Sequence, residues 1–269
     1  MNKESYTQDT LSIRLSADGF SFSVTNSINK ASFRYESLLI QPNISLTANI
    51  KQVILPHELL QKQFKEIKIL LNTPNYTIVP FELFEDEQAE TIYYQCHPKR
   101  PGETILYNIL DRCNIVIIFA IEKSTHTLLQ ELFSKARIYA SISPLIEHLA
   151  NKSRIGGNYK TYIHLRQKNT DILVFKHGQP LLINTFATLS NNDRIYYILN
   201  IWEKLALNQE HDELYIVGNH IHTEQIANDL GTYIKSVSII NPIAEFNRST
   251  AANNENIPYD LLTLLHTNF

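Results

Sequence analysis

The stretch YKTYIHLRQKNTDILVFKHGQPLLINTFAT, residues 159–188, predicts three consecutive antiparallel strands. Polar and apolar side chains alternate from Tyr162 to Arg166, with the period of two that is typical of a half-buried strand. His177-Gly178 predicts a two-residue hairpin turn, because glycine readily takes the positive φ that such turns require. Pro180 then begins the third strand, where a missing N–H costs little. The stretch is therefore a predicted β-meander.

A second meander is predicted near the N-terminus. Leu11–Leu15 and Phe20–Val24 alternate in the same way on either side of a turn, and residues 31–40 supply a third strand. Two meanders of the same layout indicate an internal duplication. Chance similarity between common β-motifs is the alternative interpretation.

A strand–helix–strand series that ends at a proline also occurs twice. In the first half its strands are Asn114–Ala120 and Arg137–Ser141, and in the second half they are Glu213–Gly218 and Lys235–Asn241. This correspondence leaves residues from about 56 to 112 as an α+β insertion in the first half. The paired glycines of residues 152–158 mark the expected boundary between a first domain, 1–152, and a second, 153–269.

The composition of the chain excludes some classes of function. The 269 residues are 43% hydrophobic and 19% charged with a net charge of −3, which indicates a folded protein and argues against a nucleic-acid binder. Only two cysteines are present, the first ten residues carry no apolar signal segment, and the longest strongly apolar run, Ile115–Ile121, cannot span a bilayer. We therefore expect a cytoplasmic protein without direct membrane insertion. Seven glycines are few for loops that wrap phosphates.

The layout resembles the actin-like ATPase superfamily, which includes actin, sugar kinases and heat-shock chaperones. The resemblance is carried by IRLSADGFSFSV (13–24), IHLRQKNTDILVFKHGQPLL (163–182) and LYIVGN (214–219). It is strongest toward the pilus-assembly and type II secretion branch and toward an uncharacterised bacterial family. It implies a duplicated, ribonuclease H-like α/β fold with mixed sheets and two lobes, the first lobe carrying the insertion.

The departures from the superfamily pattern bear on activity. Members that hydrolyse ATP carry Asp-x-Gly at the end of the first strand of each half, and the matching positions here hold Arg14 and Ser16, then His164 and Arg166. Mg²⁺ prefers oxygen ligands, which neither Arg14 nor His164 supplies. The resemblance thus implies the fold and argues against catalysis, with no catalytic or metal-binding residue assigned. The candidate cleft residues are Arg14, Ser16, Asp18, Gly19, His164, Arg166, Gly218 and Asn219.

Each candidate has a plainer interpretation. Arg14, His164 and Arg166 could hold an anion without metal, but we favour the interpretation that they lie on the exposed faces of two strands. Asp18-Gly19 fits an ordinary β-turn better than a phosphate turn. His220 and His222 form a His-x-His pair that could bind zinc or copper, yet no third ligand is signalled nearby, so a loop before a helix is favoured.

The sequence therefore predicts a non-catalytic interaction or scaffold protein without a cofactor, whose partner is an unidentified protein or a second copy. One alternative is a nucleotide-binding protein or weak ATPase that uses ATP with Mg²⁺ through acids such as Asp18 or Asp171. The other is a metal-free sensor of a phosphorylated metabolite.

Overall fold

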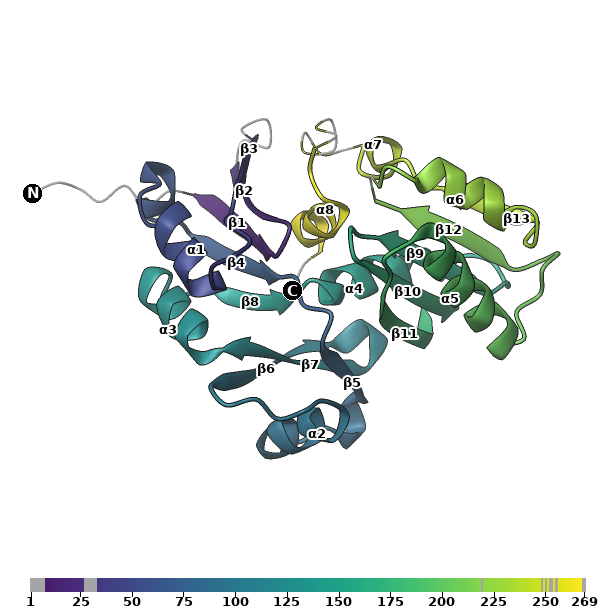
Figure 1. Ribbon diagram of the computed structural model, residues 1–269, viewed down its shortest axis with the longest axis horizontal. Coiled ribbons are helices and arrows are strands. Elements are labelled where there is room, and N and C mark those ends of the chain that lie inside the picture. The colour runs from purple at the N-terminus through teal and green to yellow at the C-terminus, as the bar shows by residue number, and fades with distance from the viewer. Residues whose placement is uncertain are drawn as a thin grey trace, which may run out of the picture. The chain divides into compact units, whose positions relative to one another are not determined.

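The computed structural model describes residues 8–26, 33–218, 220–247, 249, 251, 254 and 256–267 (Figure 1). The chain divides into two compact units, one comprising Met1–Ser143 with Ser249–Ala251 and the other Pro144–Arg248 with Ala252–Phe269. The second unit thus begins inside helix α4 (Ile142–Lys152), ahead of the glycine-containing segment in which the sequence predicts the boundary. Among the helices of the described residues, none has the length and apolarity needed to cross a membrane.

The first unit is built on a five-stranded sheet of order β3-β2-β1-β4-β8. The predicted meander forms its antiparallel part, and two further strands pair in parallel with β1 and with each other. The side chains of the central strand β1 are buried from Leu11 onward, as expected of a strand that is covered on both faces. The strands are β1 (Asp9–Ser16), β2 (Gly19–Asn26), β3 (Phe33–Leu38), β4 (Glu66–Leu71) and β8 (Arg137–Ala140).

The second unit repeats this topology with the order β11-β10-β9-β12-β13. The same pairs are antiparallel and the same pairs are parallel as in the first unit. His177 and Gly178 both have positive φ, so the hairpin turn is where the sequence predicts it. The strands are β9 (Lys160–Leu165), β10 (Asn169–Lys176), β11 (Gln179–Ala187), β12 (Glu213–Val217) and β13 (Ser236–Ile239).

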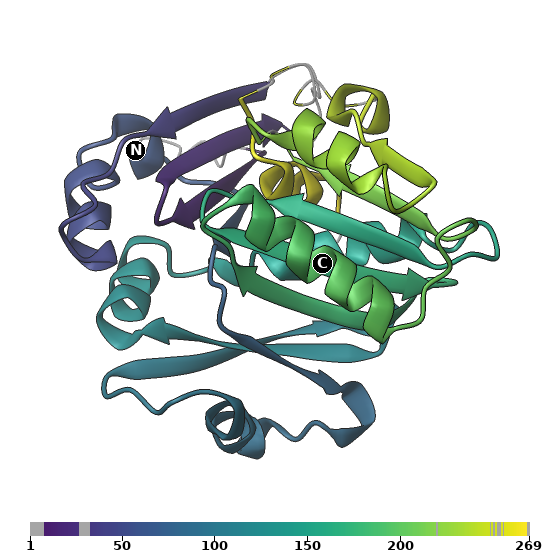
Figure 2. The same ribbon diagram turned by 45° about the vertical axis from the view of Figure 1, so that its right-hand side comes forward.

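Two helices cover one face of this second sheet (Figure 2). Helix α5 (Asn191–Lys204) begins with a capping box between Ser190 and Asp193, and α6 (Thr223–Leu230) follows β12. Trp202 of α5 and Ile226 of α6 pack against alternate residues of β9 and β10. One part of the core therefore lies between this face of the sheet and the two helices, as the apolar stripe of α5 predicts.

The first unit also contains a separate three-stranded sheet of order β5-β7-β6, and its bounds differ from those of the predicted insertion. Its strands are β5 (Tyr76–Pro80), β6 (Glu103–Leu110) and β7 (Ile115–Glu122), and α2 (Ala89–Cys96) packs on them. The expected match of Asn114–Ala120 with Glu213–Gly218 is wrong, because β4 is the strand that occupies the place of β12. The additional material thus runs from β5 to β7 rather than from about 56 to 112. An apolar run shows that a strand is buried but not which strands it pairs with.

The remaining helices complete the two units. In the first unit α1 (Leu46–Val53) begins at the cap Ser45, and α3 (Lys123–Leu132) follows β7. Short 3₁₀ turns lie at Glu58–Gln61, Phe81–Leu83, Asp86–Gln88 and Asp111–Cys113. In the second unit α7 (Pro242–Glu245) follows β13, and α8 (Tyr259–His266) is the last helix of the chain.

The buried carboxylate of Glu245 joins three helices of the second unit. It accepts hydrogen bonds from His148 at 2.8 Å, from Lys152, and from the hydroxyl of Tyr259 at 2.8 Å. Burial opposes ionisation of Glu245, but the hydrogen bonds from His148 and Lys152 outweigh it and hold its pKa below the usual value. The C-terminal helix is therefore held to α4 and α7 through one charged group.

The side chain of Asn108 links the inserted sheet to β8. Its amide donates to the carbonyl of Ile138 at 3.0 Å, and its oxygen accepts from the N–H of Ala140 at 2.9 Å and from the hydroxyl of Ser143 at 2.9 Å. Asn108 thus pairs the outer edge of β8 as a neighbouring strand would. Ala140 is fully buried.

Candidate functional site

The end of β1 holds an ion pair at the position of the first expected Asp-x-Gly. Arg14 is only 6% exposed, and its Nη1 lies 3.2 Å from Oδ1 of Asp18 in the following turn. Burial raises the pKa of Asp18, but Arg14 and the Ser16 hydroxyl lower it by more. Gly19 has φ of +147°, which a residue with a side chain rarely adopts. The structure thus brings Arg14, Ser16, Asp18 and Gly19 together around one β-turn.

The end of β9 holds a larger charged network. Asp171 on β10 lies directly opposite His164, and its Oδ2 accepts from Nδ1 of His164 at 2.9 Å. Its Oδ1 accepts from Nη2 of Arg166 at 2.6 Å and from the hydroxyl of Thr185 at 2.6 Å. Asp171 is 3% exposed. Burial opposes its ionisation, but Arg166 and His164 outweigh burial and lower its pKa to about 2.

The two units supply acidic partners to these basic side chains in different ways. His164 faces a carboxylate across the hairpin, whereas Arg14 faces Ser21 at the corresponding position. The buried hydroxyl of Ser21 has no hydrogen-bond partner among the described residues. The counter-charge of Arg14 comes instead from the turn, four residues along the chain. Both units therefore satisfy a buried cation internally.

The expectation that Arg14, His164 and Arg166 form exposed strand faces is wrong. Arg14 and His164 are buried, and the side chain of Arg166 is 9% exposed. Alternation of polar and apolar side chains suggests one solvent-exposed face, but β1 and β9 are central strands, and acidic partners hold their Arg14 and His164 side chains inside the sheets. The signal that could have revealed Asp171 as the partner is the hairpin register, which places residues 164 and 171 opposite each other.

Gly218 follows β12 directly and lies next to His164 of this network. It has φ of +92°, and a Cβ at this position would lie 3.1 Å from Cδ2 of His164. A side chain at 218 would therefore strain the backbone and press on the imidazole. The neighbouring candidate, Asn219, lies outside the described residues.

His220 and His222 lie in the loop before α6, as the interpretation of this pair as part of a loop predicts. Their ring centroids are 5.6 Å apart, and Nε2 of His220 lies 3.4 Å from Nη2 of Arg194. Burial and the neighbouring Arg194 lower the pKa of His220. Within the described part of the chain, no group of three or more His, Cys, Asp or Glu side chains is placed to hold a metal ion.

Residues 1–237 match a family described as "Protein of unknown function (DUF3822)". The chain belongs to this family. It is similar over its whole length to a solved protein from Bacteroides thetaiotaomicron VPI-5482 with an actin-like ATPase fold and unknown function, at 42% identity, 100% coverage of both chains and a TM-score of 0.86. The fold of this family member is therefore actin-like.

A more distant structural likeness is to the PilM-PilN type IV pilus biogenesis complex. The identity is 12%, the coverage is 95% of this chain and 96% of that chain, and the TM-score is 0.56. This likeness shows the fold alone, and it agrees with the branch that the sequence resembles. None of the curated proteins matches this chain significantly.

The pKa of Asp171 predicts a loss of stability in acid. An unfolded aspartate has a pKa of about 3.9, so a folded pKa of about 2 means that the folded state binds the proton less readily. The stabilisation is fully present above about pH 4 and is lost as the pH falls toward about 2. We expect the difference in unfolding free energy between the wild type and Asp171→Asn to shrink by about 2–3 kcal/mol over this range. Urea denaturation at stepped pH measures it, and a constant difference would contradict the assignment.

Proposed function

We propose that this protein is a non-catalytic interaction or scaffold protein with a degenerate actin-like nucleotide site. The observation that carries the proposal is the internal neutralisation of both former motif positions, by Asp18 in the first unit and by Asp171 in the second. Superfamily members that hydrolyse ATP are expected to present carboxylates and bare glycine backbone at these positions.

The contacts of Asp171 weigh against its use as a magnesium ligand. Mg²⁺ needs oxygen ligands in near-octahedral geometry. Both oxygens of Asp171 already accept hydrogen bonds, one from His164 and two from Arg166 and Thr185. Binding a metal there would leave Arg166 without its counter-charge and His164 without its hydrogen-bond acceptor, which is unfavourable for groups with so little exposure.

The same contacts weigh against a phosphate sensor. A phosphate group would compete with Asp171 for His164 and Arg166, and with Asp18 for Arg14. Buried cations that already have a counter-charge gain little from a second anion, because the site would then carry excess negative charge.

One further observation supports an interaction role, and two others bear on the origin and the compartment of the protein. The structural neighbour of similar length was solved as the PilM-PilN complex, which gives an example of this fold in a protein assembly. The equal strand order of the two sheets supports an internal duplication that kept the architecture while the motif residues changed. The two free cysteines, Cys96 and Cys113, suit a reducing compartment such as the cytoplasm. The partner is a protein of unknown identity or a second copy.

Thermal unfolding with ATP or ADP, each with and without Mg²⁺, tests the proposal. A nucleotide at 100 times its Kd stabilises a protein by about 2.7 kcal/mol, which shifts the midpoint visibly. We expect no shift with millimolar nucleotide. A Mg²⁺-dependent shift would overturn the proposal in favour of a nucleotide-binding protein or weak ATPase. A shift with inorganic phosphate alone that disappears in Arg14→Ala would overturn it in favour of the metabolite sensor.

A further inference from the structure

The strands β8 and β13 occupy equivalent edges of the two five-stranded sheets. Ala140 pairs with Leu71 in the first unit, and Ile239 pairs with Ile216 in the second. In each unit the residue that follows donates its N–H inward, from Ser141 to Leu71 and from Ile240 to Ile216, both at 2.9 Å. Because backbone groups alternate in direction along a strand, those of Ala140 and Ile239 point outward, away from the sheet.

The inserted sheet covers this edge in the first unit. Asn108 of β6 bonds the outward carbonyl of Ile138 and the outward N–H of Ala140. Strand β6 also contacts α3, the helix that connects the inserted sheet to β8. A strand of the chain itself therefore fills the space beside β8 and under α3.

The described residues of the second unit form no inserted sheet, and only residues 218–222 separate β12 from α6. Ile239 is 37% exposed, whereas its counterpart Ala140 is fully buried. Among the described residues, none bonds the outward N–H of Ile239 or the outward carbonyl of Val237. The edge of β13 is thus an open sheet edge, which is a ready template for another strand.

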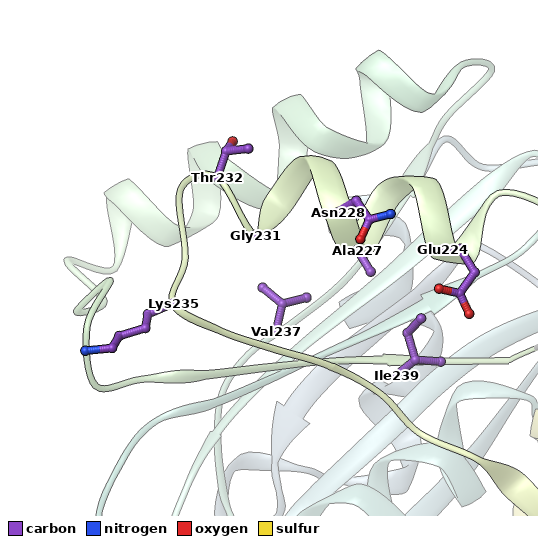
Figure 3. Close-up of a pocket in the computed structure, with 8 residues that line it drawn as sticks. All are labelled: Glu224, Ala227, Asn228, Gly231, Thr232, Lys235, Val237 and Ile239. Carbon is purple, nitrogen blue, oxygen red and sulfur yellow. The ribbon is translucent and has the colours of Figure 1, made fainter.

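An open groove of about 480 Å³ follows this edge (Figure 3). One wall is the α6 stripe that carries Glu224, Ala227 and Asn228, and the floor is formed by Val237 and Ile239. These two alternate residues of β13 point to the same face, so the groove has the period that a docked strand requires.

The two ends of the groove differ in charge. In Figure 3 Lys235 lies at one end, and Glu224 lies above Ile239 at the other. Lys235 is already paired with Glu210 at 2.9 Å, whereas Glu224 has no ion pair among the described residues. The unneutralised charge of the groove is therefore negative.

We propose that this groove docks an extended segment of a partner protein, which adds to β13 as a sixth strand. Its backbone bonds the outward groups of Val237 and Ile239, an apolar side chain lies between α6 and β13, and a basic side chain pairs with Glu224. The inference rests on the proposed interaction function, for which it names the docking surface and the chemistry of the partner segment. The precedent is the chain's own β6, which fills the same place in the first unit.

A second copy is a poorer occupant than a peptide. Strand β13 has four residues, so pairing two copies edge to edge would bury far less than the roughly 800 Å² per partner of a stable interface. A flexible segment needs only the main-chain bonds and one or two seated side chains for specific, reversible binding.

Selection from a phage-displayed library of random 12-residue peptides on the full-length protein tests the inference. Selected peptides are synthesised, and their affinity is measured by fluorescence anisotropy. We expect alternating apolar residues with a basic residue, and at least tenfold weaker binding to Ile239→Pro. Proline removes the outward N–H without removing a bond to β12, because edge positions tolerate it. Ile239→Val retains the N–H and is expected to bind normally.

A second pair of variants tests the inference even if Ile239→Pro does not fold. Asn228→Arg places a long side chain in the groove from an exposed helix position, and Gln225→Arg makes the same change on α6 outside the groove. We expect at least tenfold weaker binding for the first and unchanged binding for the second. Equal binding to all variants, no peptide above background, or an Ile239-dependent dimer in analytical ultracentrifugation without peptide binding would each overturn the inference. A Mg²⁺-ATP response with groove-dependent peptide binding intact would overturn the proposed function alone.

Discussion

Replacing Asp171 by alanine is expected to lower the free energy of unfolding by about 3–5 kcal/mol, the usual cost of removing one partner of a buried ion pair. The reason is local. His164 and Arg166 would remain inside the sheet without the carboxylate that accepts their hydrogen bonds. The hydroxyl of Thr185 would also lose this acceptor. Chemical denaturation followed by circular dichroism measures the change.

The matched control is Glu210→Ala, which removes the same charge from an exposed pair with Lys235 in the same unit. Pairs of this kind contribute less than about 1 kcal/mol. A loss below about 1 kcal/mol for Asp171→Ala as well would mean that water reaches the network, and the internal neutralisation of the motif positions would then be wrong.

Replacing Asn108 by alanine is expected to cost about 2–4 kcal/mol, because each buried polar group that loses its partner costs about 1–3 kcal/mol. The carbonyl of Ile138 and the N–H of Ala140 would both lose the partner that caps the edge of β8. Hydrogen exchange should show the Ala140 amide among the groups whose protection falls most.

Asn184→Ala is the control for this change, since Asn184 is an exposed strand residue in the second unit. Such surface substitutions usually stay within about 0.5 kcal/mol. If Asn108→Ala is equally mild and Ala140 remains protected, β6 does not act as the strand that covers this edge, and the comparison with the open edge of β13 loses its basis.

The meanders were predictable because their information is local. Alternating side chains fix each strand, and the turn at His177-Gly178 fixes the connection. The parallel partner of β1 was not predictable in this way. EIKILL of β4 and IVIIFAIE of β7 are both apolar runs, and only the packing of distant segments decides which one enters the five-stranded sheet.

The candidate site also has features that the sequence predicts and features that it does not. The resemblance identified Arg14 and His164 as the positions that depart from the ATPase pattern, but their burial follows from the sheets that surround them. Asp171 lies opposite His164 because of the hairpin register, so a register argument would have found this partner. The capping role of Asn108 has no local signal, because the asparagine bonds a strand 30 residues away along the chain.

Isothermal titration calorimetry of the full-length protein with Mg²⁺-ATP tests most directly whether the motif positions have become structural. With His164 and Arg166 held by Asp171, and Arg14 held by Asp18, we predict no binding heat up to millimolar nucleotide. Saturable, Mg²⁺-dependent binding with a Kd below about 100 μM, which corresponds to more than about 5 kcal/mol of binding free energy, would contradict the account.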